Sequence, residues 1–191
     1  MTTKDLTPEY LAKFHSGAGL HSNLETKIVL HCVLTEERFM LDHGIQVAQP
    51  IQLQMTLLDQ MAFCHSPVLS AACCDVLSQE EIKILSGNLF FPYNIFSAPN
   101  KLIQEWVNFV VPRVTQVMDK IGCGGTYDSC LEFVKNNESF TKPVEGKNTD
   151  PVYQARIGAF LAERMNSIFW QLLQVPRNYQ QVILLEENQK I

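Results

Sequence analysis

The segment that follows Asp150-Pro151 restricts the fold more than any other part of the chain. Asp150 can cap the first turn of a helix there, and Pro151 suits the first helical position. Apolar residues then recur at three- and four-residue steps and form one stripe along a helix. The stripe consists of Ile157, Leu161, Met165, Ile168 and Leu172. We therefore expect a helix from residue 151 to about residue 173, with one face buried in the core.

Prolines, glycines and capping residues divide the rest of the chain into short elements. Pro67 and the capping box Ser78–Glu81 each begin a helix. Helices are expected at residues 8–16, 35–44, 54–66, 67–77, 79–86 and 100–121, and strands at 27–34, 45–47, 89–96 and 181–185. Because Pro92 cannot donate to a central ladder, the strand at 89–96 can also be two edge segments. This order predicts a helix-rich α/β fold, a single domain over residues 1–191 with a small sheet.

Residues 123–149 form the most polar stretch between expected elements. They include three glycines and several asparagines, which favour turns and loops. A loop of this length in a compact domain is usually functional or disordered. We expect a mobile loop here, with one short helix at residues 127–134.

Charge and cysteine content limit the class of protein. The 191 residues carry a formal charge of −5 without a Lys/Arg cluster, which argues against binding nucleic acid or an anionic membrane. No apolar run is long enough to span a bilayer, and residues 1–9 lack the basic and apolar regions of a secretory signal. We therefore expect a cytoplasmic protein with no integral membrane segment and with reduced thiols.

A metal site is the alternative interpretation of some of these thiols. It would use Cys64, His65, Cys73 and Cys74. Their spacing matches no familiar zinc pattern, and the adjacent Cys73 and Cys74 point to different faces of a helix. Small buried core residues are the simpler interpretation of the cysteines.

Charged side chains flank the apolar stripe of the last helix. Arg156 and Glu163 are seven residues apart and therefore almost eclipsed, and Arg164 lies between this polar edge and the stripe. One interpretation is a salt-bridged shoulder on the helix. The other is the wall of a pocket, in which arginine suits phosphate or carboxylate groups and glutamate suits sugar hydroxyls.

A second cluster is Tyr93-Asn94-Ile95-Phe96. Asn94 offers both a donor and an acceptor, and Tyr93 and Phe96 offer aromatic faces. Saccharides are recognised by this mixture of stacking and directional hydrogen bonding, so these three residues are candidates for substrate binding. The alternative is a core strand with one hydrogen-bonded asparagine.

Two stretches of sequence carry a family resemblance. The first is residues 88–96, NLFFPYNIF, followed by a helix that contains Trp106, and the second is residues 153–164, YQARIGAFLAER. In their order and spacing they resemble hallmarks of a bacterial family of domains of unknown function found in capsular-polysaccharide and lipopolysaccharide glycosyltransferases. A fainter match at Gly44–Pro50, Gln60 and His65 extends the similarity to residues 44–173, which correspond to the carboxy-terminal part of that family.

The resemblance implies the acceptor-side half of a GT-A-like glycosyltransferase. Such an enzyme transfers a hexosyl unit from a nucleotide sugar to a cell-surface polysaccharide precursor, and the family implies a divalent metal such as Mn or Mg. Glu163 is then the candidate catalytic base or acceptor anchor. Arg156 and Arg164 are candidates for phosphate contact or for holding Glu163 ionised. The chain contains no Asp-x-Asp metal motif.

A non-catalytic interaction module or partner subunit, derived from a truncated glycosyltransferase, is the competing hypothesis. The sequence lacks a counterpart of the family's amino-terminal nucleotide-binding strands, so a homo-oligomer or a partner chain supplying the missing half is expected under this hypothesis. An open cleft lined by Tyr93, Asn94, Arg156 and Glu163 would favour the enzyme. The same residues buried and hydrogen-bonded to one another would favour the module.

Overall fold

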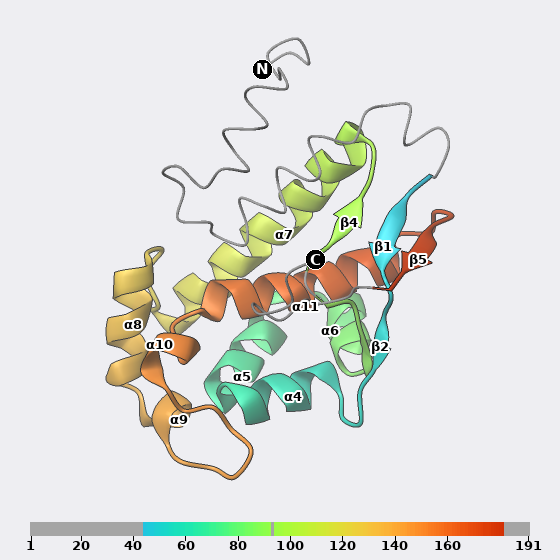
Figure 1. The fold of residues 1–191 in the computed structure, drawn as a ribbon. Coiled ribbons are helices and arrows are strands. Elements are labelled where there is room, and N and C mark those ends of the chain that lie inside the picture. The colour runs from blue at the N-terminus through green and yellow to red at the C-terminus, as the bar shows by residue number, and fades with distance from the viewer. Residues whose placement is uncertain (1–43, 93, 182–191) are drawn as a thin grey trace, which may run out of the picture.

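The computed structural model describes residues 44–92 and 94–181, which Figure 1 shows in colour. The helices expected at 8–16 and 35–44 and the strand expected at 27–34 lie outside the described residues. Tyr93 and most of the strand expected at 181–185 lie outside them as well.

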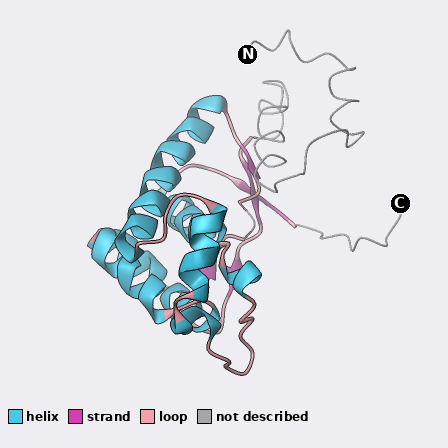
Figure 2. Cartoon of the chain, turned by 90° about the vertical axis from the view of Figure 1, so that its left-hand side faces the viewer, coloured by secondary structure: helices cyan, strands magenta, loops and turns pink. Residues whose placement is uncertain are grey.

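The described part of the chain is helix-rich with small sheets, as the sequence predicts for a single α/β domain. Its helices are α4 (Leu57–Cys64), α5 (Pro67–Val76), α6 (Gln79–Leu85), α7 (Asn100–Ile121), α8 (Tyr127–Lys135), α9 (Glu138–Thr141), α10 (Pro151–Gln154) and α11 (Ile157–Leu172). Its strands are β1 (Gln46–Ala48), β2 (Ile51–Gln52), β3 (Leu89–Phe90), β4 (Phe96–Ser97) and β5 (Asn178–Gln180). Figure 2 shows the helices gathered on one side of the molecule and the strands along the other.

Local capping signals set several helix boundaries. The Ser66 side chain accepts a hydrogen bond from Val68 N, and Pro67 occupies the first turn of α5. Ser78 and Glu81 form the expected capping box at the start of α6, with the Glu81 carboxylate accepting from Ser78 N at 2.8 Å. These starts and the bounds predicted for α7 are confirmed.

The strands form two small sheets. In the first, β1 lies between β4, to which it is antiparallel, and β5, to which it is parallel. In the second, β2 pairs antiparallel with β3. Residues 89–96 therefore contribute one short strand to each sheet, which confirms the interpretation as two segments around Pro92. The strand β5 at Asn178–Gln180, which pairs with β1, was not predicted.

Helix α11 crosses the middle of the molecule and packs mainly against α7 (Figure 1). The predicted stripe is confirmed, because Ile157, Leu161, Met165 and Ile168 are fully buried and Leu172 packs against the same core. The prediction of one continuous helix from residue 151 is wrong. The Arg156 amide bonds to Tyr153 O, three residues back, and this tight turn separates α10 from α11.

Residues 123–149 contain more helix than expected. The helix predicted at 127–134 is confirmed as α8, and a second helix, α9, which was not predicted, follows it. The physical reason is burial, because apolar side chains of both helices reach the main core. They are Cys130 and Val134 of α8 and Phe140 of α9. The mobility expected of this segment stays a prediction.

None of the helices in residues 44–92 and 94–181 combines the length and the apolar character needed to cross a membrane.

Candidate functional site

The two segments of sequence that carry the predicted site residues meet between β3 and α11. Ser167 Oγ accepts a hydrogen bond from Phe91 N at 3.0 Å, and Asn166 Nδ2 donates to Phe91 O at 3.1 Å. One turn further along α11, Gln171 Nε2 donates to Leu89 O at 3.1 Å. Three side chains of α11 are thus hydrogen-bonded to the backbone of residues 89–91, which belong to the first motif segment. We call this contact region, from Leu89 to Phe91 and from Glu163 to Gln171, the β3–α11 junction.

Asn166 connects the junction to α7. Its Oδ1 accepts hydrogen bonds from Trp106 Nε1 and from Trp170 Nε1, each at 2.9 Å. Trp106 is the tryptophan that the family resemblance singled out. Through Asn166 it is connected to Phe91, which belongs to the first motif segment, and to α11, which carries the second. Sequence reasoning missed Asn166 and Ser167. The available signal was a polar pair inside an otherwise apolar helical stretch, because such groups are buried only with partners.

Phe96 is not at an accessible surface. It is 3% exposed, and its ring lies 5.3 Å from that of Trp106 and 5.1 Å from that of Trp170. Core packing therefore occupies the aromatic surface that was expected to stack on a sugar. We correct the assignment of Phe96: it is a packing residue behind the junction, as the alternative interpretation of this strand held.

Asn94 lies in the link between β3 and β4 in a strained conformation. Its φ is 48°, in the left-handed region, where no other non-glycine residue of the described chain is found. Its Oδ1 is buried and has no hydrogen-bond partner. Strain and an unsatisfied polar atom in one residue are features that cluster at functional sites. Tyr93, the neighbouring candidate, falls outside the described residues.

Arg164 is a buried charged residue of the junction. It is 3% exposed, its Nη2 donates to Gln60 Oε1, and its guanidinium lies 4.6 Å from the centre of the Phe90 ring. Burial lowers the pKa of Arg164, and the charge of Glu163 opposes this shift. The distance from Arg164 Nη1 to Glu163 Oε2 is 3.4 Å. With its side chain 26% exposed, Glu163 remains accessible from solvent.

Two polar atoms are left without partners at or next to this site. Among the residues that the structure describes, Asn94 Oδ1 and Arg164 Nε are the only buried side-chain nitrogen or oxygen atoms that lack a hydrogen bond. Both belong to residues that the sequence selected as site candidates. Buried polar groups are nearly always satisfied by protein, water or a ligand, so each such atom calls for an explanation.

Arg156 lies at the start of α11, away from the contacts that Ser167 and Asn166 make with Phe91. It is exposed at the N-cap of this helix. Its guanidinium lies 5.8 Å from the Phe160 ring instead. Eleven residues separate it from Ser167, a distance of about 16 Å along a helix axis. Arg164 is the arginine in the 3.4 Å ion pair with Glu163, and the shared Arg156–Glu163 edge stays a prediction.

A buried histidine lies behind Arg164. His65 Nδ1 is 3.1 Å from Gln154 Oε1, and the imidazole stacks on Phe160 with ring centres 3.9 Å apart. The pKa of His65 is lowered from 6.5 to about 4, mainly by burial. The hydrogen bond of Gln154 opposes this shift, and the charges of Arg164 and Lys147 add to it. At neutral pH this histidine is uncharged.

The described residues do not fit a metal ion. Cys73 is buried while Cys74 is exposed, as expected for adjacent helical residues, so they do not converge with Cys64 and His65. No set of three or more His, Cys, Asp or Glu side chains within residues 44–92 and 94–181 is arranged to hold a cation. The divalent metal implied by the family resemblance therefore has no donor set in this part of the chain.

The chain matches no protein-family model, and no significant match is found among curated proteins or solved structures. The chemistry of the site therefore rests on its own residues and geometry.

Proposed function

We propose that this chain is a glycosyltransferase-like protein, which transfers a hexosyl unit from a nucleotide sugar to a cell-surface polysaccharide precursor at the β3–α11 junction. One observation carries the proposal: the two buried polar atoms without partners in the described chain, Asn94 Oδ1 and Arg164 Nε, both lie in the motif segments of that resemblance. The hydrogen bonds through Phe91 that join these segments support it.

Glu163 is suited to the role of base in this reaction. Its side chain is 26% exposed, and one carboxylate oxygen lies 3.4 Å from Arg164 Nη1. In the proposed step the acceptor hydroxyl gives its proton to Glu163 while its oxygen bonds to the anomeric carbon. The bond from that carbon to the diphosphate breaks, and the nucleoside diphosphate leaves.

Asn94 and Arg164 would position the reacting groups. The Asn94 amide oxygen can accept a hydrogen bond from a sugar hydroxyl, and Arg164 Nε can donate to an oxygen that approaches from the side of β3. Asn94 follows Phe90 by four residues, a span of at most about 14 Å, so a saccharide bound there can extend toward Glu163. Arg156 lies at the N-terminal end of α11, seven residues from Glu163, or about 10 Å along the helix axis. A phosphate contact by Arg156 would therefore require a ligand that also reaches the N-terminal end of α11.

The test is hydrolysis and transfer with a panel of nucleotide sugars, comparing Glu163→Gln with Glu105→Gln. Glu105 is a matched control, because it is a half-exposed glutamate on α7 paired only with Lys101 at 3.9 Å. We expect Glu163→Gln to lower turnover by about 100-fold or more, as for other general bases, and Glu105→Gln to leave it unchanged. Absence of donor hydrolysis, together with no ligand-induced rise in melting temperature, would contradict the proposal.

Stability separates a site role of Glu163 from a structural one. If the carboxylate serves catalysis, Glu163→Gln costs little stability, because the side chain is partly exposed and Arg164 keeps Gln60. If it serves mainly as the partner of a buried arginine, the substitution destabilises the fold by about 3 kcal/mol, the cost of stranding a buried charge. Unfolding in urea at neutral pH distinguishes the two outcomes. A destabilised variant with unchanged ligand affinity would end the assignment.

A non-catalytic interaction module is the second candidate. The burial of Phe96 and Arg164 and the lack of a metal donor set in the described residues favour it. As a partner subunit or homo-oligomer it would acquire a complete site only by association. Sedimentation velocity of the full chain tests this: association without any nucleotide-sugar turnover supports the module, whereas a monomer that turns over the donor rules it out. Cytoplasmic location, part of either proposal, is checked by cell fractionation.

A further inference from the structure

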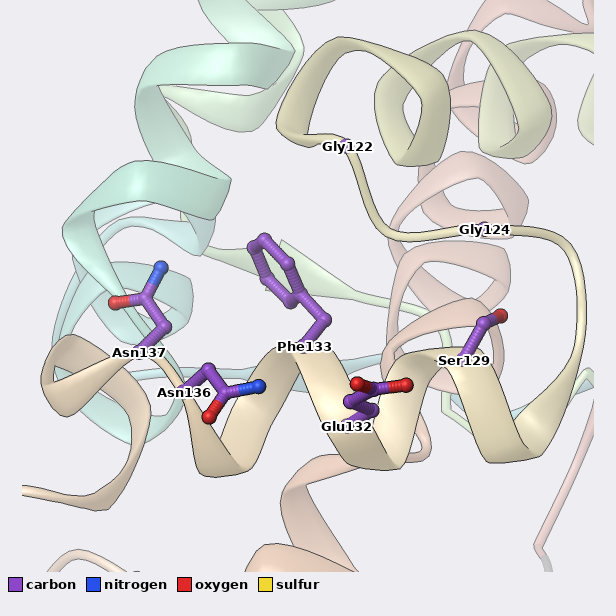
Figure 3. Close-up of a pocket in the computed structure, with 7 residues that line it drawn as sticks. All are labelled: Gly122, Gly124, Ser129, Glu132, Phe133, Asn136 and Asn137. Atoms are coloured by element: carbon purple, nitrogen blue, oxygen red, sulfur yellow. The ribbon is translucent and has the colours of Figure 1, made fainter.

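A polar groove lies at the opposite end of the helical layer from the strands, between α8 and the loop that follows α7. Its volume is about 400 Å3. Figure 3 shows the ring of Phe133 standing in the middle of the groove, with Asn137 at one end and the loop from Gly122 to Gly124 over the other. The residues that line it are Gly122, Gly124, Ser129, Glu132, Phe133, Asn136 and Asn137. None of them belongs to the β3–α11 junction, so this is a separate feature.

One face of α8 forms the wall of the groove. Ser129, Glu132, Phe133 and Asn136 are three and four residues apart and therefore share this face. The adjoining face is anchored in the core by Cys130 and Val134, which are 3% and 0% exposed. Phe133 lies between the two faces and also packs partly against this core. Thr126 and Ser129 form a capping box that fixes where α8 begins. The groove residues are thus mounted on a helix whose position is set by burial of its adjoining face.

Two glycines allow the loop to close over this face. Gly122 ends α7 with φ at 74°, a conformation that other residues adopt at a cost. A side chain on Gly124 would place its Cβ 2.7 Å from Ser129 Oγ, which is a clash. Gly125, in contrast, has nothing within 4 Å of a Cβ built on it. Close approach of the loop to α8 therefore depends on Gly124 and not on Gly125.

The lining of the groove selects for hydroxyl-rich, uncharged ligands. Glu132 and Asn136 make no side-chain hydrogen bond or ion pair within the described residues, and one turn of helix separates them. Asn137 uses its Oδ1 to accept from Ser139, which leaves its Nδ2 as a donor. No lysine or arginine lines the groove, and the Glu132 carboxylate would repel a phosphate. A carboxylate, amides and one aromatic ring are the groups that hydrogen-bond and stack on sugars.

From this arrangement we propose that the α8 groove is a binding site for a neutral saccharide. Glu132 and Asn136 accept and donate hydrogen bonds to adjacent hydroxyl groups, Phe133 contacts an apolar face of the sugar, and the Gly122–Gly124 loop closes one end. The groove is of the size at which small-ligand sites begin, which suits one or two hexose rings. This binding site stands by itself. If the proposed transfer takes place at the junction, the groove holds a part of the acceptor glycan remote from the reacting hydroxyl.

The test is titration of the full-length chain with maltotriose, cellotriose and tri-N-acetylchitotriose, followed by calorimetry and by amide shifts in two-dimensional NMR. We expect at least one of the three to bind and to shift amides of residues 122–137. Asn136→Ala should weaken that binding by about tenfold, the effect of losing one or two hydrogen bonds. Lys135→Gln, an exposed position of α8 outside the groove, is the control and should bind as the wild type does.

The glycines give a second matched pair. Gly124→Ala should weaken saccharide binding because the loop must move away from Ser129, whereas Gly125→Ala should not. Absence of binding by all three trisaccharides at millimolar concentration overturns the proposal. So does binding that Asn136→Ala and Gly124→Ala leave unchanged, or amide shifts confined to other parts of the chain.

Failure of this proposal is distinguishable from failure of the proposed transfer. Glu163→Gln should abolish turnover of a nucleotide sugar and leave trisaccharide affinity unchanged. Saccharide binding without donor hydrolysis would support the groove and count against the enzyme. Donor hydrolysis without saccharide binding would do the reverse.

Discussion

Acidification should destabilise this protein through His65. Gln154 Nε2 donates to Cys64 O at 2.8 Å and also to Asn148 O, so its Oε1 faces the imidazole and His65 Nδ1 carries the proton of the neutral ring. A second proton would have to be placed on Nε2, in a buried site near the positive charges of Arg164 and Lys147. The folded protein resists this protonation, whereas the unfolded chain does not.

The sign and size follow from linkage. The pKa of His65 is about 4 in the folded state and near 6.5 in the unfolded chain, so between these values the unfolded state binds more protons and stability falls as the pH falls. At roughly 1.36 kcal/mol per pKa unit, the full loss is about 3 kcal/mol. Most of it, about 2.5 kcal/mol, should appear between pH 7 and pH 4.5. Stability from this source is fully present above pH 6.5.

The assay is urea unfolding followed by far-ultraviolet circular dichroism at several pH values between 7 and 4.5. His65→Asn is the matched variant, because asparagine does not titrate and its amide can still donate to Gln154. The variant should be less stable at pH 7, since the ring contact with Phe160 is lost, but its pH dependence should be shallower by about 2.5 kcal/mol. The other four histidines are common to both proteins and cancel in the comparison. Equal pH dependence in the two proteins would refute the reasoning.

Two further predictions concern backbone strain and ion pairs. Asn94→Ala should destabilise the fold by about 1 kcal/mol, because alanine tolerates a φ of 48° poorly, while Asn94→Gly should not; if thermal unfolding shows equal losses for both, the amide and not the backbone is responsible. Arg113→Met should cost about 2 kcal/mol, because it strands Glu81, whose side chain is 7% exposed and lies 2.6 Å from Arg113 Nε. Lys120→Met, which breaks the exposed pair with Asp75, should cost under about 1 kcal/mol, and a similar cost for both substitutions in urea unfolding would contradict this distinction.

The sequence predicted best those structural features that depend on residues close to one another along the chain. The stripe on α11 follows from side-chain spacing alone, and the capping box at Ser78 and the glycine at the end of α7 act within one helical turn. The break before α11 was missed because nothing local requires it. It coincides with the buried Gln154, whose amide bonds to the carbonyls of Cys64 and Asn148, and such partners are known only from the fold.

The candidate site shows the same division: the chemistry of single residues can be recognised in the sequence, whereas their packing cannot. Asn94 and Glu163 were selected by their chemistry, and the structure gives Asn94 a strained backbone and Glu163 a partly exposed carboxylate beside Arg164. Phe96 was selected on equal grounds but is enclosed by aromatic rings. A polar or aromatic residue looks the same in the sequence whether it lies in a cleft or in the core. Only the tertiary packing distinguishes the two positions. The polar residues around α9 likewise concealed the buried position Phe140.

Because both tryptophans donate to Asn166, their fluorescence is an intrinsic probe of this part of the fold. The chain contains two tryptophans, and both indoles donate to the same Asn166 oxygen, so its tryptophan emission arises at one point of the fold. Trp170 is fully buried and Trp106 is partly buried, which makes the emission wavelength sensitive to the entry of water between α7 and α11. A substrate that displaces residues 89–96 would change the signal without any dye. A saccharide in the α8 groove, remote from both indoles, would leave it unaltered.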